Sequence, residues 1–261
     1  MTQLLADIIE ADRYQIGDEN FCSGCRRTLD ENGVLVLPDF LTRTAIASIQ
    51  KEGEKNRHLA YYTSDNHNIY LTPPDPHYPA NHVRNREVTS SKGCITTDQI
   101  PNQSALRTLY DAPGFRQFLC AVLGETNLFE YADPLSSINL HYASDGQELG
   151  WHFDNSSFAV TLLIQKPDGG GEFEYVKDVR DADRAEMNFE LAEKVLDGEV
   201  PTNTLTMGEG TLVLFRGRNS MHRVTPVIGA RTRMLVVLAY NSEPGISLSE
   251  SARMTFFGRL G

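Results

Sequence analysis

The chain has 261 residues, of which 40% are hydrophobic, and this suits one sizeable domain, although two small domains would also fit. Its 24 Lys and Arg against 35 Asp and Glu give a net charge of -11, so a polyanionic partner would be repelled. We therefore expect neither nucleic acid nor an anionic membrane as a partner. The first residues lack the pattern of a signal peptide, and no stretch has the ~18 apolar residues of a membrane span, which predicts a cytoplasmic protein.

Four cysteines are too few for the disulfide framework of a secreted scaffold. Only Cys22 and Cys25 lie close together in the sequence. A structural zinc site needs a second such pair, which the chain lacks. We expect ordinary cysteines that bind no metal.

The first half of the chain is predicted to be mostly helical, with one early strand and one long loop. The loop covers residues 61–101, which are rich in Asn, Pro, His, Ser and Thr. A loop of this length in a compact domain is usually a functional lid or a disordered segment, and we expect His67, His77 and His82 within it to be exposed to solvent. The predicted regular elements are helices at 4–12, 42–54, 103–110 and 113–123 and a strand at 34–37.

From Ser136 onward the sequence changes to short β runs separated by turn signals, a pattern typical of a sandwich or barrel. A helical insert at 181–197, free of glycine and proline, interrupts these runs. We predict one domain over 1–261, with helical support and a lid in 1–130 and the β core in 131–245. The predicted strands are 138–142, 151–153, 158–165, 171–176, 204–207, 211–215, 222–226 and 233–240.

Three side chains form a candidate metal site. His152 and Asp154 stand at positions i and i+2, which project from the same face of a strand. A second histidine, His222, lies far off in the sequence at the start of another predicted strand. Two histidines and one carboxylate make the facial triad that leaves three coordination positions open on Fe(II).

Two arginines follow His222 at the start of the last apolar strand. Arg231 and Arg233 share one face if the strand already includes them. An arginine aimed into a barrel near the metal is suited to hold a carboxylate through two parallel hydrogen bonds.

The ordered combination of 150–154, the strand to Gln165, 169–175, 211–215, 222–227 and the two arginines resembles the Fe(II)/2-oxoglutarate-dependent dioxygenases. Within that family it is most similar to the bacterial small-molecule hydroxylases. The resemblance covers residues 130–245. It implies a mainly β protein with flanking helices around a double-stranded β-helix core, with Fe(II) as cofactor and 2-oxoglutarate and O2 as co-substrates.

The resemblance also implies roles for individual residues. His152, Asp154 and His222 match the iron ligands. The arginine that holds 2-oxoglutarate is either Arg231, nine positions after the distal histidine, or Arg233, eleven after it; we favour Arg233. Tyr142 is similar to a tyrosine that contacts 2-oxoglutarate in relatives. Halogenating relatives have a small residue where this chain has Asp154, which disfavours halogenation.

Two further residues on the strand before the triad, Asn139 and His141, share one face and either line the pocket or face solvent. Tyr142 points the other way if the strand is regular, so a packing role is its alternative. We predict hydroxylation of a small molecule, such as an amino acid or a natural-product intermediate. The alternatives are desaturation, epimerisation or cyclisation by the same oxidant, a protein hydroxylase, and a non-catalytic binding barrel.

Overall fold

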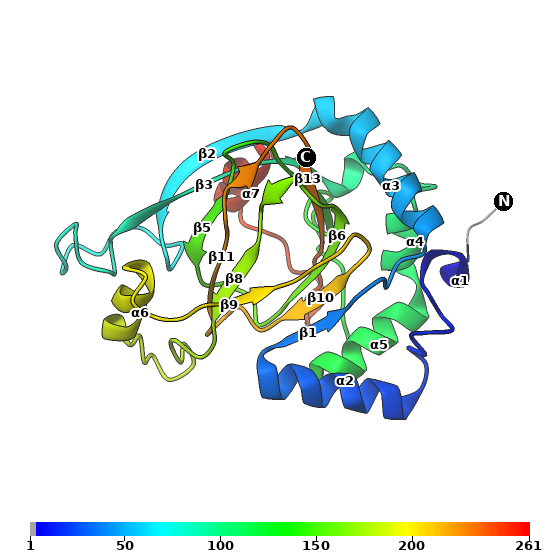
Figure 1. Cartoon of the computed structure of the whole chain (residues 1–261), viewed down its shortest axis with the longest axis horizontal. Coiled ribbons are helices and arrows are strands. Elements are labelled where there is room, and N and C mark those ends of the chain that lie inside the picture. Colours follow the sequence, from blue (N-terminus) through cyan, green and yellow to red (C-terminus); the bar gives the residue numbers. More distant parts are fainter. Residues whose placement is uncertain (1–3) are drawn as a thin grey trace.

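One strongly curled antiparallel sheet forms the centre of the protein (Figure 1). The computed structural model describes residues 4–261, so residues 1–3 of the predicted domain lie outside it. The sheet order is β1-β10-β6-β13-β4-β3-β5-β11-β8-β9, with β2 paired to β3. This arrangement confirms the predicted double-stranded β-helix. The strands are β1 (Val34–Leu37), β2 (Tyr61–Asn68), β3 (Glu87–Ile95), β4 (Ile138–Ala143), β5 (Leu149–His152), β6 (Ala159–Gln165), β8 (Phe173–Val176), β9 (Asn203–Leu205), β10 (Leu212–Phe215), β11 (Met221–Val224) and β13 (Arg233–Leu238); β7 (Gly169–Gly170) and β12 (Val227–Ile228) form a separate pair.

The side chains of the strands alternate between the helical layer and the inside of the curled sheet. In β10, Leu212 and Leu214 join the core beneath the helices, whereas Val213 and Phe215 belong to an apolar cluster inside the barrel. This alternation follows from the two-residue period of a strand. It fixes which residues of each strand can reach the barrel interior.

Helices at the N-terminal side of the core cover one outer face of the sheet (Figure 1). α2 begins after Asp18, whose side chain accepts from the backbone N–H of Phe21, and ends at Gly33 in the left-handed conformation. Cys22 and Cys25 are buried on the inner side of α2. No helix within residues 4–261 has the length and apolar character required to cross a membrane. The helices are α1 (Leu5–Ile8), α2 (Glu19–Asn32), α3 (Arg43–Asn56), α4 (Ala105–Asp111), α5 (Pro113–Leu123), α6 (Phe189–Leu196) and α7 (Glu250–Phe257), with short 3-10 turns at Arg57–Leu59 and Thr97–Gln99.

The region predicted as one long loop is largely a pair of strands, so that prediction was wrong. β2 pairs with β3 over eight residues, and only 69–86 between them is irregular. β2 is at the edge of the sheet, and most of its residues are polar and exposed, so it lacks the apolar alternation that marks a strand in a sequence. β3 pairs with both β4 and β5 and so connects the two halves of the curled sheet.

The insert predicted as helical over 181–197 is helical only in α6. Its first part forms a turn at Asp181, whose carboxylate accepts hydrogen bonds from the backbone N–H groups of Asp183 and Arg184. Such turns compete with the helix for the same backbone groups. α6 and the 69–86 segment together cover the outer side of β5 and of the residues just after it, where Trp151 and Phe153 are buried.

Candidate metal and co-substrate site

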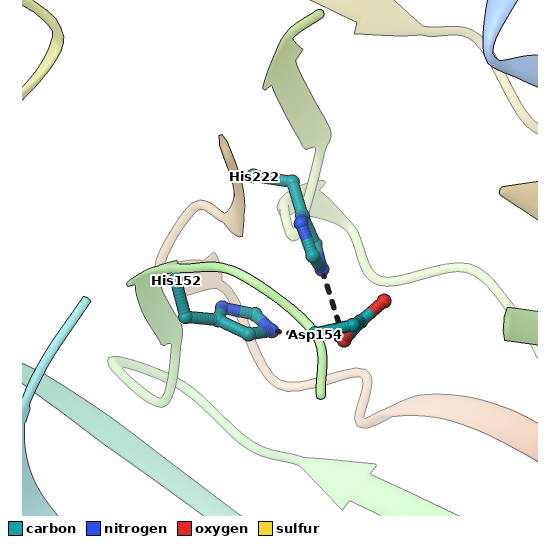
Figure 2. Close-up of side chains that lie close together, drawn as sticks. All are labelled: His152, Asp154 and His222. Atoms are coloured by element: carbon teal, nitrogen blue, oxygen red, sulfur yellow. Dashed lines mark ion pairs between the residues drawn. The ribbon is translucent and has the colours of Figure 1, made fainter. Parts of the chain in front are cut away.

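The three predicted ligands converge in the structure (Figure 2). His152 ends β5 and is directly paired with His222 on β11, so both rings project from the inner face. Oδ1 of Asp154 lies 3.8 Å from Nε2 of His152 and 3.5 Å from Nε2 of His222. One ligand atom from each residue falls within 4.8 Å of the other two. The arrangement is that of a metal-binding facial triad.

Backbone carbonyls orient both imidazole rings. Nδ1 of His152 donates to the carbonyl of Gly150 at 2.8 Å, and Nδ1 of His222 donates to that of Ser220 at 3.0 Å. With the proton on Nδ1, each Nε2 presents a lone pair toward Asp154. Burial, followed by the neighbouring His222, lowers the pKa of His152 to about 3, which keeps this ring neutral and ready to bind a metal.

The carboxylate of Asp154 independently indicates a cation-binding site. Its Oδ2 is buried and has no hydrogen-bond partner among the described residues. A buried carboxylate oxygen without a partner is costly, and a divalent metal between the three residues would satisfy it. Two imidazoles and one carboxylate are the donor set that suits Fe(II), so these residues fit the predicted metal.

The two candidate arginines are in different surroundings. Arg233 opens β13 opposite Ala143, is only 6% exposed, and shares the inner face of the strand with Leu235. Burial lowers its pKa to about 10, and Glu172 partly offsets this, so the guanidinium stays charged at neutral pH. Arg231 precedes the strand and is exposed, and its side chain pairs with Glu209 at 2.7 Å.

The structure does not bring Tyr142 to the triad. Its ring is buried on the helical side of β4, and its hydroxyl donates to the carbonyl of Gly53 in α3 at 2.8 Å. The alternation of strand side chains is the physical reason, because the barrel-facing positions of β4 belong to its neighbours. Asn139 and His141 do line a cavity, although the amide of Asn139 already donates to the carbonyls of Leu135 and Ile138.

Two residues near the site were not predicted there: His67, which was expected to be exposed but is half-buried, and Lys92. The ring of His67 is 6.4 Å from that of His152, and its Nε2 lies 2.6 Å from the hydroxyl of Ser90. Lys92 lies on β3, 3.5 Å from Nδ1 of His141. Both stand in the stretch predicted as a loop. If 61–68 and 87–95 had been interpreted as paired strands, the alternation of side chains along each strand would have shown which face His67 and Lys92 occupy.

Comparison with known proteins places the chain among related folds. The structure of an oxidoreductase of the 2OG-Fe(II) oxygenase family from Burkholderia pseudomallei is 16% identical, covers 87% of this chain and 93% of its own, and has a TM-score of 0.55. The carbocyclase SnoK from nogalamycin biosynthesis is 13% identical, with coverages of 88% and 89% and a TM-score of 0.59. A prolyl hydroxylase from Trichoplax adhaerens is 12% identical, with coverages of 86% and 90% and a TM-score of 0.55. No curated protein matches the sequence.

Fold and triad together define a double-stranded β-helix protein with a candidate facial-triad metal site, and the resemblance in fold to the Fe(II)/2-oxoglutarate-dependent dioxygenases is confirmed. The family described as Halogenase D matches residues 18–255, so the chain belongs to that family. The resemblance implied a small residue at position 154 in halogenating relatives. The triad of this chain instead contains the carboxylate of Asp154.

Proposed function

We propose that this protein is an Fe(II)- and 2-oxoglutarate-dependent enzyme that hydroxylates an unactivated C–H bond of a small molecule, an amino acid or a natural-product intermediate. The observation that carries the proposal is the convergence of His152, Asp154 and His222 in a barrel whose inner face also holds the buried Arg233. A metal site alone suits many functions. A buried, charged guanidinium in the same barrel supplies the anchor that a dicarboxylate co-substrate needs.

The residues of the site have separate tasks. The triad would hold Fe(II), which together with 2-oxoglutarate and O2 supplies the oxidising chemistry. Arg233 would hold the far carboxylate of 2-oxoglutarate. Phe173 and Phe215 pack against His222 with ring centroids 5.4 Å and 4.9 Å away, and they keep water from this side of the site.

Asp154 supports hydroxylation over halogenation. With a metal bound, the carboxylate of Asp154 would take the position that a halide needs, so membership in a family described as Halogenase D does not by itself assign halogenation to this chain. Among proteins of similar fold, SnoN is an epimerase and SnoK a carbocyclase. Epimerisation, cyclisation or desaturation is therefore the second candidate, and a protein hydroxylase the third.

The test is a screen for substrate-stimulated turnover. The protein, loaded with Fe(II) and 2-oxoglutarate, is exposed to air with each amino acid and its derivatives, and succinate and product masses are measured. Hydroxylation adds one oxygen to the product, desaturation removes two hydrogens, and halogenation adds a halogen when chloride is present. If Fe(II) binding is absent, or is unchanged in His152→Ala, the proposal is wrong.

A further inference from the structure

His67 is a half-buried histidine on β2, a strand whose residues are mostly exposed. It is paired with Val88 of β3, and its side chain reaches diagonally to Ser90 on the same strand. Diagonal neighbours of this kind share one face of a sheet. The ring of His67 also meets that of His152 edge-on, with centroids 6.4 Å apart and an angle of 86° between the planes. The polar edge strand therefore directs one ring toward the metal site.

The hydrogen bonds of His67 run in a defined direction. Its Nδ1 lies 3.0 Å from the carbonyl oxygen of Asn68, which can only accept, so the neutral ring carries its proton on Nδ1. Its Nε2 then accepts from the hydroxyl of Ser90 at 2.6 Å. Oγ of Ser90 in turn accepts from the backbone N–H of Gly150 at 2.9 Å. His67 thus orients the Ser90 hydroxyl so that an oxygen lone pair faces Gly150.

Gly150 connects this chain of hydrogen bonds to a metal ligand. Its carbonyl accepts from Nδ1 of His152 at 2.8 Å. β3 and β5 meet here, since Ser90 is paired with Leu149, and a Cβ atom on Gly150 would lie 2.5 Å from the carbonyl oxygen of Thr89. The position of Gly150 is therefore set by β3. Because its carbonyl binds the imidazole, that position determines how the ring of His152 is turned.

The second histidine ligand has different neighbours. The ring of His222 packs against those of Phe173 and Phe215, whereas the ring of His152 meets the polar ring of His67. A change at His67 should therefore act on one histidine ligand and leave the other as it is. This asymmetry supplies an internal reference for an experiment.

We infer that His67 is a positioning residue for His152, which acts through Ser90 and Gly150 to aim Nε2 of this ring at the metal. The inference rests on the proposed function only in that it needs a metal held by His152. β2, which carries none of the three ligands, thereby contributes to the metal affinity.

The test begins with substitutions in the full chain and anaerobic titration with Fe(II). His67→Phe keeps an aromatic ring but cannot accept from Ser90, and it should weaken Fe(II) binding roughly tenfold. His67→Gln offers an amide oxygen as acceptor and should stay within about threefold of the wild type. Asn66→Ala is the matched control, because it removes an exposed hydrogen bond from Thr89 between the same two strands and should leave the affinity unchanged.

Two further measurements separate positioning from a merely structural role. Ser90→Ala should weaken Fe(II) binding about as much as His67→Phe, and the double variant should lose no more than either, because both act through one chain of hydrogen bonds. In the Co(II)-substituted protein, proton NMR detects the Nδ1–H groups of both bound imidazoles. His67→Phe should shift one of these two signals and leave the other in place. A structural role alone would lower the free energy of unfolding without these effects.

Equal Fe(II) affinities in His67→Phe and Asn66→Ala, additive losses in the double variant, or two unchanged Nδ1–H signals would overturn the inference. A loss that His67→Gln fails to restore would overturn it as well, because the hydrogen bond would then not be the cause. If the wild type binds no Fe(II), the proposed function fails and the inference with it. Fe(II) binding without 2-oxoglutarate binding rejects the proposed function alone, and a normal 2-oxoglutarate complex with unchanged variants rejects the inference alone.

Discussion

Gly217 leaves the space that the carboxylate of Asp154 occupies. A Cβ atom at position 217 would lie 1.8 Å from Oδ2 of Asp154 and 3.0 Å from Cε1 of His222. The carbonyl of Gly217 also accepts from the backbone N–H of Asp154 at 3.1 Å. The main chain at this position therefore forms one wall of the metal site, and a side chain there would displace a ligand.

Gly217→Ala should weaken Fe(II) binding by roughly tenfold to a hundredfold while the fold persists, because the added methyl group must push Asp154 or His222 away. Anaerobic titration with Fe(II) measures this loss, and thermal unfolding confirms the fold. Gly208→Ala is the matched control, since a Cβ there has no atom within 4 Å. Equal affinities in the two variants would contradict this role of Gly217.

Substitutions of the two arginines should have different effects on the affinity for 2-oxoglutarate. Arg233→Met is expected to raise the dissociation constant of 2-oxoglutarate roughly tenfold or more, because hydrogen bonds to charged groups contribute about 1.5–3 kcal/mol. Arg231→Met should leave that constant near the wild-type value, since its side chain is exposed and paired with Glu209. The measurement is 2-oxoglutarate titration of the Fe(II) protein. The reverse pattern would assign the co-substrate to Arg231.

Tyr142→Phe tests a packing role for this residue. Removing the hydroxyl leaves the buried carbonyl of Gly53 without its donor, which should lower the free energy of unfolding by about 1 kcal/mol. Urea unfolding measures the loss. The affinity for 2-oxoglutarate should not change, and a weaker affinity at full stability would instead support the co-substrate contact that the sequence predicted.

The acid stability of the metal-free protein should depend on His141. Its folded pKa is well below the unfolded value of 6.5, so the unfolded chain binds more protons below pH 6.5. The stabilisation is thus present above pH 6.5 and lost as the pH falls, at a rate that approaches about 1.4 kcal/mol per pH unit. Burial of the ring, and then the positive charges of Lys92 and Arg233, maintain the low pKa of His141.

Urea unfolding at pH 7 and pH 5 measures this effect. His141→Gln should lose less stability than the wild type between these two values, because glutamine cannot take up the proton. An identical loss in both proteins would show that His141 is protonated as readily in the fold as in the unfolded chain.

The sequence predicted the triad because its residues stand in strong local patterns. His152 and Asp154 have the i and i+2 spacing of residues that point to the same side of an extended chain, and His222 follows a clear apolar strand. The choice between Arg231 and Arg233 depended on where β13 begins, which apolar periodicity does not define to the residue. The sequence predicted a strand over 233–240, and the structure confirms that β13 begins at Arg233.

Strands β2 and β3, and with them the place of Lys92 in the cavity, were not predicted from the sequence. β2 is polar along most of its length because both of its faces meet solvent, so its pairing with β3 leaves no periodic signal. The position of Lys92 depends on that pairing. α2 was also absent from the predicted helices, because its buried residues, Cys22, Cys25 and Leu29, are few.

The position of β13 in the sheet has a consequence for biosynthesis. This strand comes near the end of the chain, yet it inserts between β6 and β4 and pairs with both. Until it has emerged from the ribosome, the sheet has a gap at its centre, and the edges of β4 and β6 remain unpaired. Such distant pairing slows folding, and iron loading on this barrel is therefore expected to follow synthesis of the chain.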